Sequence, residues 1–334
     1  MAVVVLETAH AFLAHQAGPG HPERPARLEA VLAGIEQAGL DEGVLHVAPR
    51  AARRDELELV HPASYLDALQ RFCETGGGPI DADTGANASS WQAAVHGAGS
   101  GLDAVERLDR GEAGAAFCAV RPPGHHATAE RAMGFCLLNN VAVCAAMLAQ
   151  RGERVLIVDY DAHHGNGTQD AFWSDPRVAY VSFHQWPLYP GTGRLDDIGA
   201  GAGAGTTVNL PFPPGTGGDT YREAVDDVVV PFAERFSPTW LLLSAGFDAH
   251  RADPLAGLGL SAGDFGDLTA RLVRLVPAGR VVAFLEGGYD LAALSDSAGA
   301  CVAALAGEVW RPEAATGGDR GRPVVEAARR QHGL

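Results

Sequence analysis

The sequence lacks a pattern of cysteines that could crosslink a fold or bind a metal. The five cysteines of the 334-residue chain are scattered, mostly within apolar runs, and no Cys-x-x-Cys pair occurs. Disulfide-stabilised folds and thiolate zinc sites both depend on paired or closely spaced cysteines. The sequence therefore argues against both classes, and we expect any bound metal to be held by Asp and His side chains.

Long apolar segments and an excess of positive charge are also missing. No stretch of 18 or more uncharged apolar residues occurs, and residues 1–7 lack the basic start and apolar core of a signal peptide. We expect a soluble, cytoplasmic protein with no membrane partner. The 25 basic and 41 acidic residues give a net charge of −16. This charge disfavours direct nucleic-acid binding, and it suits either cationic partners or solubility alone. The oligomeric state is left open.

What the chain does contain is a regular alternation of strand-like and helix-like segments. Apolar, β-branched runs predict strands at residues 3–6, 115–120, 154–159, 178–183, 239–244 and 280–285. Apolar residues at helical spacing predict helices at 27–38, 62–72, 89–108, 134–150, 219–235, 261–276 and 290–306. Loops are expected at 76–85 and 199–205, and a loose tail at 310–334. The alternation predicts an α/β fold of one domain, 1–334, with its core at about 3–306. A mostly parallel central sheet would have helices on both faces.

Residues 154–169 are the most informative stretch, because an aliphatic run there changes abruptly into carboxylates, imidazoles and glycines. In an extended chain Asp159, Asp161 and His163 project to one side. One carboxylate and one imidazole from this row, with a third ligand from elsewhere, would form a divalent metal site open to water and substrate. The alternative is that Asp161 caps the next helix and His163 lies in a surface loop. The metal site is favoured, since acids at the end of a buried strand are costly without compensation.

Other polar residues follow the predicted strands in the same way. In parallel sheets, ligands bind beyond the carboxyl ends of the strands. The residues at those ends are His125, His126, His184, Asp248 and Tyr289. We therefore expect the polar chemistry to gather at one rim of the sheet.

This set of residues suits amide hydrolysis assisted by a metal. The reaction needs a base for the attacking water, an acid for the departing amine and a donor for the developing oxyanion. His125 and His126 could supply the first two, with Asp159 orienting one of them. Tyr289 follows two glycines and could donate its phenol proton to the oxyanion. Two loop histidines and a packed aromatic remain the alternatives.

The sequence resembles the metal-dependent histone deacetylases and their class II-like bacterial relatives, which include acetylpolyamine amidohydrolases. The resemblance runs from about residue 15 to residue 305. It is carried by His21–Leu28, Arg121–Ala127, Gly134–Cys136 with Asn139–Asn140, Asp159–Gln169, Ser244–Ala249 and Glu286–Tyr289. These motifs occur in the family's order, and the resemblance implies the arginase/deacetylase fold.

The resemblance also implies a reaction centre. Zn²⁺, with Fe²⁺ as an alternative, would be held by Asp161, His163 and Asp248. His125 would pair with Asp159, and His126 would be the principal general base with Tyr289 as oxyanion donor. The partner of His126 here resembles the class II branch, in which it is an asparagine, Asn166. Because asparagine adds no charge, we expect the pKa of His126 to be shifted upward less than that of His125.

Further residues are implied around this centre. The aromatic walls of an acyl-lysine tunnel match Phe135 and Tyr189, although Tyr189 is commonly Phe in the family. The other substrate-binding candidates are Gly134, Leu255 and Asp83, the last of which could equally be a turn acid beside Asp81. A structural K⁺ would be bound near Asp159, Asp161, His163, Ser182 and Phe183. Arg27 matches an arginine lining a channel through which acetate leaves.

The substrate expected from these residues is acyl-lysine in a peptide or protein. The polyamine-specific branch tends to carry Glu seven residues after the last metal ligand, and this chain has Leu255 there. A small acylated amine, such as an acetylpolyamine, is the alternative substrate. A binuclear ureohydrolase would need more carboxylates, and Gly165 stands two residues after His163. A non-catalytic acyl-lysine reader would be expected to lose the base or the tyrosine, yet His126 and Tyr289 are present.

Overall fold

A parallel sheet runs through the middle of the computed structural model, which describes residues 2–40 and 43–334. Within these residues the sheet has eight strands, in the order β2-β1-β5-β10-β9-β6-β7-β8, and every pairing is parallel. The strands are β1 (Val4–Glu7), β2 (Val44–Val47), β5 (Ala115–Cys118), β6 (Val155–Asp159), β7 (Val178–Gln185), β8 (Thr207–Phe212), β9 (Trp240–Ala245) and β10 (Val281–Leu285). The predicted α/β class with a parallel sheet is confirmed.

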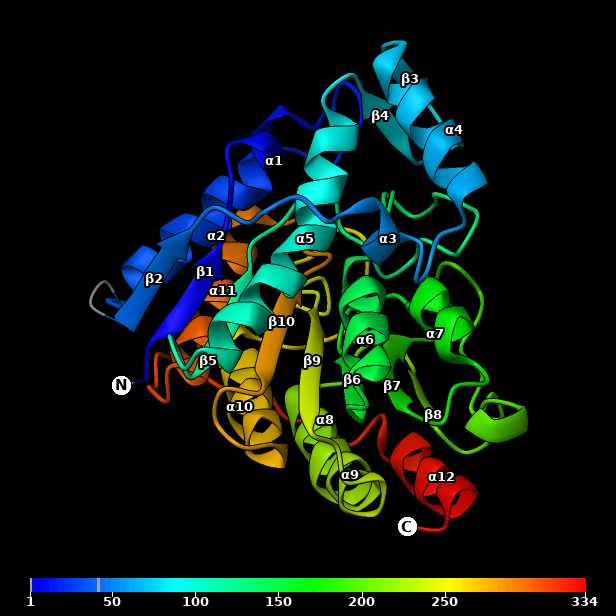
Figure 1. Cartoon of the computed structure of the whole chain (residues 1–334). Coiled ribbons are helices and arrows are strands. Elements are labelled where there is room, and N and C mark those ends of the chain that lie inside the picture. The colour runs from blue at the N-terminus through cyan, green and yellow to red at the C-terminus, as the bar shows by residue number, and fades with distance from the viewer. Residues whose placement is uncertain (1, 41–42) are drawn as a thin grey trace.

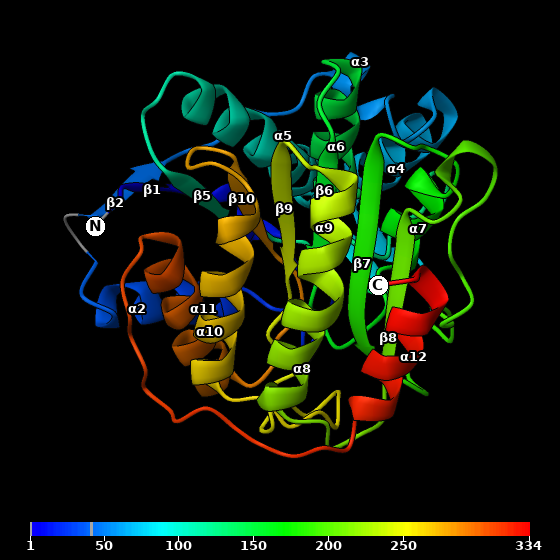
Figure 2. The same ribbon diagram turned by 90° about the horizontal axis from the view of Figure 1, so that it is seen from below.

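Helices cover both faces of the sheet (Figure 1, Figure 2). One face is covered by α5 (Ser90–Asp109) and α6 (Asn140–Gln150). The other is covered by α2 (Ala26–Gln37), α8 (Gly218–Ala224), α9 (Val230–Phe236), α10 (Ala262–Leu272), α11 (Leu291–Leu305) and α12 (Arg322–His332). Apart from Asp159 at the end of β6 and Ser244 in β9, the strands β6, β9 and β10 consist of apolar residues, and they are fully buried, as expected for a sheet covered on both sides.

Shorter elements complete the chain outside these layers. They are α1 (Ala11–Ala14), α3 (Arg54–Leu57), α4 (Ala63–Glu74), α7 (Asn166–Phe172) and the hairpin strands β3 (Gly77–Pro79) and β4 (Gly85–Asn87). A π-helical turn, Val225–Val229, joins α8 to α9. No helix in the described part of the chain is long and apolar enough to cross a membrane.

Strand order brings the predicted rim together. The strands β5, β10, β9, β6 and β7 are consecutive neighbours, so the loops that follow their carboxyl ends lie side by side. These loops carry the histidine pair, Tyr289, Asp248, the Asp161–His163 row and Tyr189. Five segments that are distant in sequence therefore surround one site.

Some predicted boundaries are wrong for identifiable reasons. The helix predicted from Gly134 begins only at Asn140, where the Asn139 side chain caps it by accepting from the Ala142 N–H. Before that cap, Gly134 and Phe135 have φ angles of 55° and 69°, which a right-handed helix cannot contain. The Phe135 ring is thereby turned toward the site instead of joining a helix.

The predicted loose tail is also wrong. Residues 322–332 form α12, whose apolar side chains Val325 and Ala328 are buried against the core. This helix packs on β8, a strand that was not predicted. The expected loop at 76–85 contains β3 and the first residue of β4, which pair as a hairpin. The glycine-rich 199–205 segment contains a short 3₁₀ turn. The unpredicted elements are β2, β3, β4, β8, α1, α3, α7 and α12.

Candidate active site

Three predicted metal ligands converge although they come from two different strands. Asp161 and His163 follow β6, and Asp248 follows β9. The His163 Nδ1 atom lies 2.8 Å from an Asp248 oxygen and 3.1 Å from an Asp161 oxygen. One potential ligand atom of each residue lies within 4.8 Å of the others, and within the described residues no other group of three such side chains does so. The structure thus brings the predicted triad together.

The electrostatics of this triad favour a cation. Burial acts to raise the pKa of Asp161, but the neighbouring His125 and His163 outweigh it and lower that pKa. Burial and the Asp161 charge raise the pKa of Asp248 to about 7. The two carboxylates overcome the effect of burial on His163 and raise its pKa to about 10. The protonated imidazole of His163 stabilises the two buried carboxylates. A divalent cation between them could stabilise them in the same way.

Two glycines leave room for the carboxylates to meet. A Cβ atom on Gly246 would lie 2.0 Å from an Asp161 oxygen, and one on Gly287 would lie 2.3 Å from an Asp248 oxygen. The Gly287 N–H also donates to Asp161 at 2.7 Å. Two carboxylates and one imidazole form a donor set that suits Zn²⁺ with an open position, so the residues present fit the predicted metal.

The histidine pair has the two partners that the sequence predicts. His125 Nδ1 lies 3.0 Å from an Asp159 oxygen, and His126 Nδ1 lies 2.9 Å from the Asn166 amide oxygen. The two ring centroids are 4.0 Å apart, and the His126 ring lies 6.1 Å from that of His163. Both oxygens accept, so each imidazole carries its proton on Nδ1 and directs Nε2 away from its partner.

The two histidines have opposite pKa shifts. Burial acts to lower the pKa of His125, but Asp159, Asp161 and Glu286 outweigh it and raise the value to about 10. Burial lowers the pKa of His126 well below its usual value, and the positive charges of His125 and His163 add to this effect. His126 is therefore neutral at physiological pH, which agrees with the expectation that it is the less basic-shifted of the pair.

A narrow cavity of about 240 Å³ leads to this centre. It is lined by Asp83, His126, Gly134, Phe135, His163, Leu188, Tyr189, Leu255 and Tyr289. The Phe135 and Tyr289 ring centroids lie 5.7 Å apart, while the Tyr189 ring lies 5.2 Å from His126. Every predicted substrate-binding residue thus lines one tunnel, and Leu188 is a wall residue that the sequence did not reveal.

Tyr289 is held by groups that reach it from other elements. Burial raises the pKa of its phenol well above the usual value, so the hydroxyl keeps its proton. The guanidinium of Arg27 lies 4.9 Å from the ring centroid, and it donates to the carbonyls of Glu286 and Gly288. Arg27 therefore lies behind the tyrosine and does not line the tunnel. Its predicted place in an acetate channel stays a prediction.

Two buried carboxylates that the sequence did not assign also hold the site. Asp253 accepts from the Tyr289 N–H at 2.7 Å and, through its other oxygen, from the Leu255 N–H at 2.9 Å. Glu286 accepts from the backbone N–H groups of Gly124 and His125 through one oxygen. Since these contacts are to backbone N–H groups across loops, no spacing in the sequence indicates them.

The predicted K⁺ ligands are neighbours, although their role stays a prediction. Asp159 on β6 is paired in register with Ser182 on β7, and Phe183 follows directly. The Ser182 hydroxyl lies 2.9 Å from His184 Nδ1, which belongs to β7 itself and not to the loop after it. The Tyr180 hydroxyl donates to Asp159 at 3.0 Å, a contact that was not predicted.

Asp83 lies at the tunnel, but its side chain is partly engaged locally. Its carboxylate accepts from the Thr84 hydroxyl at 2.8 Å, and burial raises its pKa above the usual value. The neighbouring Asp81 accepts from the N–H groups of Asp83 and Thr84, which is the turn that the sequence suggested. Asp83 can therefore face a substrate while its neighbour stabilises the turn.

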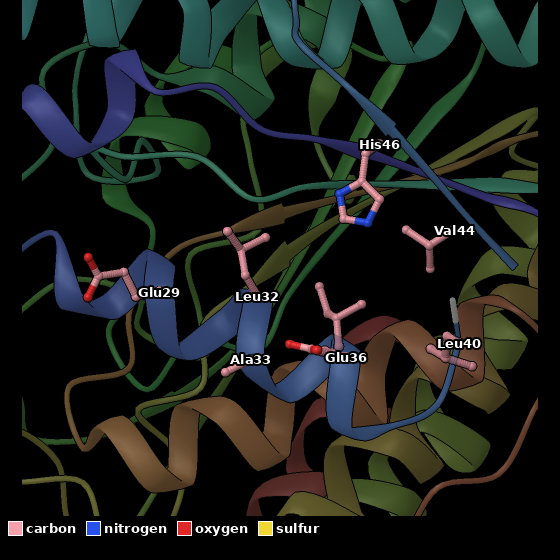
Figure 3. A pocket seen from close by; sticks show the side chains of 8 residues that line it. Glu29, Leu32, Ala33, Glu36, Leu40, Val44 and His46 are labelled. Atoms are coloured by element: carbon pink, nitrogen blue, oxygen red, sulfur yellow. The ribbon is translucent and has the colours of Figure 1, made fainter. Parts of the chain in front are cut away.

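A pocket elsewhere on the molecule differs in chemistry from the tunnel. It lies between α2 and β2 and has a cavity volume of about 460 Å³ (Figure 3). Leu32, Leu40 and Val44 contribute apolar walls, with Glu36 and His46 among the polar ones. None of the metal-ligand triad or the histidine pair lines it, so its greater volume does not make it the reaction site.

Comparisons with known proteins agree with this geometry. A profile of the histone deacetylase domain matches residues 21–305. A "Probable deacetylase" of Archaeoglobus fulgidus is 39% identical over 303 residues, covering 89% of this chain and 84% of the relative. "Histone deacetylase 10, chloroplastic" of Oryza sativa is 42% identical over 316 residues, covering 86% and 70%. The crystal structure of the HDA15 HD domain superposes with a TM-score of 0.92 at 37% identity, covering 99% of this chain and 94% of that one.

Proposed function

Since the chain belongs to the histone deacetylase family, as its sequence predicts, we propose that it is a zinc-dependent lysine deacylase acting on peptides or proteins. The observation that carries the proposal is the convergence of the metal-ligand triad, the histidine pair and Tyr289 at the end of one tunnel. A deacetylase-type hydrolase already follows from the relatives, and the metal, the mechanism and the substrate are the proposed parts.

The metal would be held by Asp161, His163 and Asp248. When bound, it supplies a Lewis acid that polarises the amide carbonyl and acidifies water. His126 takes the proton from the attacking water, because its Nδ1 proton is directed to Asn166 and its Nε2 lone pair is free. The resulting imidazolium has no carboxylate at its Nδ1 and lies in a buried place, which favours passing the proton to the departing amine.

Tyr289 donates its hydroxyl to the oxygen that gains charge in the transition state. Tyr289→Phe should lower kcat by about 10²–10³ with little change in KM, since the donor acts mainly in the transition state. Tyr189→Phe, at the exposed mouth of the tunnel, is the matched control and should retain most activity. Equal losses in the two variants would contradict the assignment.

The substrate proposal depends on the tunnel wall. The aromatic rings and Leu255 suit the apolar stem of an acylated lysine, and they offer no carboxylate deep in the tunnel for a second amine. Purified enzyme should hydrolyse acetyl-lysine peptides faster than acetylspermidine. Much faster hydrolysis of acetylspermidine would favour the polyamine alternative instead.

The cytoplasmic location stays a prediction, since the rice relative carries the word chloroplastic in its name.

A further inference from the structure

An apolar groove lies beside the tunnel on the outer surface of α4. Tyr65, Leu69 and Phe72 present one face of this helix at positions i, i+4 and i+7. Facing them are the loop residues 79–81 and 130–132, and the cavity between them is about 480 Å³. We call this feature the α4 groove.

The α4 groove and the tunnel are two sides of one wall. In the segment 79–84, Ile80 and Asp81 line the groove while Asp83 lines the tunnel. In the segment 130–135, the first three residues line the groove while Gly134 and Phe135 line the tunnel. A ligand that fills the tunnel and continues over its mouth therefore meets the groove next.

Hydrogen bonds hold this wall in place. The Phe135 N–H donates to the Thr84 hydroxyl at 3.1 Å, which ties the two segments together. The Ile80 N–H donates to the Thr84 carbonyl at 2.7 Å. On the helix side, the Tyr65 hydroxyl donates to the Leu137 carbonyl at 2.6 Å, so the ring is fixed. A groove that is already formed costs little ordering when a ligand binds.

The chemistry of the groove suits an apolar side chain on a cationic polypeptide. Its floor is made by the half-buried Phe72 and Tyr65 rings and by Ile80. The rim carries the acids Asp81 and Glu130 and a single exposed base, Arg131, which lies 3.9 Å from Asp81. With Asp83 at the adjoining tunnel, acids outnumber bases around the path from the tunnel to the groove.

We propose that the α4 groove binds an apolar residue of the substrate polypeptide close in sequence to the acylated lysine. This inference rests on the proposed lysine deacylase function. In each of the two segments, the last groove residue and the first tunnel residue are two positions apart, Asp81 and Asp83 in one and Ala132 and Gly134 in the other. An extended chain spans about 3.3–3.6 Å per residue. The apolar residue therefore lies about two or three positions from the lysine. A free acylated polyamine has no side chain that could fill the groove, so the groove selects polypeptides.

The test compares a short substrate with peptides. The short substrate is acetyl-lysine blocked by small groups at both ends, and the peptides carry Leu or Ser two or three positions from acetyl-lysine on either side. The variants are Phe72→Ser and Ile80→Ser. Leu32→Ser, in the half-buried wall of the pocket between α2 and β2, is the matched control (Figure 3).

For the wild type we expect kcat/KM to be roughly ten-fold higher for a Leu peptide than for its Ser counterpart, mainly because KM is lower. Burial of one leucine side chain is enough to give a difference of this size. Phe72→Ser and Ile80→Ser should remove this preference, and Leu32→Ser should keep it. Equal rates on Leu and Ser peptides in the wild type, or an unchanged preference in both groove variants, would overturn the inference.

The short substrate separates this inference from the proposed function. If the wild type does not hydrolyse it or any peptide, the deacylase proposal fails. The groove is then judged by fluorescence anisotropy of a labelled Leu peptide. If the wild type binds the Leu peptide more tightly than the Ser peptide and Phe72→Ser loses this difference, the result supports binding in the α4 groove. Equal affinities for the two peptides in the wild type would contradict it.

Discussion

Two adjacent imidazoles have different partners and opposite pKa shifts. His125 faces the Asp159 carboxylate, whereas His126 faces the neutral amide of Asn166. Burial acts to lower the pKa of both rings. At His125 the neighbouring carboxylates outweigh burial and raise the pKa, whereas at His126 the hydrogen bond to Asn166 does not offset burial and the charges of His125 and His163. The ring that borders the tunnel is thus the one that can accept a proton at neutral pH.

Changing this partner should move the pH dependence of the reaction. In Asn166→Asp, a carboxylate next to Nδ1 favours protonated His126 and raises its pKa. The base must be neutral to act, so the acid limb of kcat/KM against pH should move up by about one unit or more. An acid limb in the same place as in the wild type would show that His126 is not the group that titrates.

Asp253 is a second residue whose contacts set the site. Its two oxygens accept from the N–H groups of Leu255 and Tyr289, so one carboxylate fixes a tunnel wall and the proposed oxyanion donor together. An asparagine there could accept at only one of the two oxygens. Asp253 therefore acts as a positioning residue for Tyr289.

Asp253→Asn should lower kcat by roughly 10–100-fold, as expected when a catalytic group is misplaced. In the background of Tyr289→Phe, the same change should cost much less, because its effect passes through the missing hydroxyl. Asp290→Asn is the control, since asparagine can still cap α11 as Asp290 does. Losses that simply multiply in the double variant would contradict a positioning role.

At the scale of elements, the chain's own pattern predicts the central strands well and the edge poorly. Within the runs predicted at 154–159, 239–244 and 280–285, residues 155–158, 240–243 and 281–285 are continuous, apolar and buried, so local composition is a strong signal. The edge strand β8 contains Asn209 and Pro211 and exists because it pairs with β7 and is covered by α12. Such support from distant residues leaves no local signal.

The same reason explains what was found and missed in the site. Asp161, His163, Asp248 and both histidines of the pair follow predicted strands, so their place after the strands of a parallel sheet was enough to expect them at one rim. The turn at Gly134 and Phe135 was predicted as helix, because apolar residues there mimic a helical pattern. Its positive φ angles are imposed by its surroundings, including the Thr84 hydroxyl that accepts from the Phe135 N–H.

The packing of α12 gives a prediction at this scale. Val325→Ala removes two buried methyl groups and should lower the free energy of unfolding by about 1–2 kcal/mol. Urea denaturation would measure it. Val309, which is 81% exposed, is the control, and its change to Ala should cost less than about 0.5 kcal/mol. Similar small values for both variants would mean that α12 contributes little to the core.

At the scale of the whole molecule, the sheet gathers buried acids and imidazoles at one rim of a chain with a net charge of −16. All 25 of its basic residues are arginine, because the sequence contains no lysine. The proposed substrate group is therefore absent from the enzyme itself. Any acyl-lysine signal in an assay must come from the added substrate.

The measurement that tests the central claim most directly is a metal titration of the chelator-stripped protein. Hydrolysis of an acetyl-lysine peptide should be lost on stripping and should return as Zn²⁺ or Fe²⁺ is added, reaching a plateau near one metal ion per chain. Asp248→Ala should not recover under the same conditions. Full activity in the stripped protein, or recovery by Asp248→Ala, would contradict a reaction centre built on Asp161, His163 and Asp248.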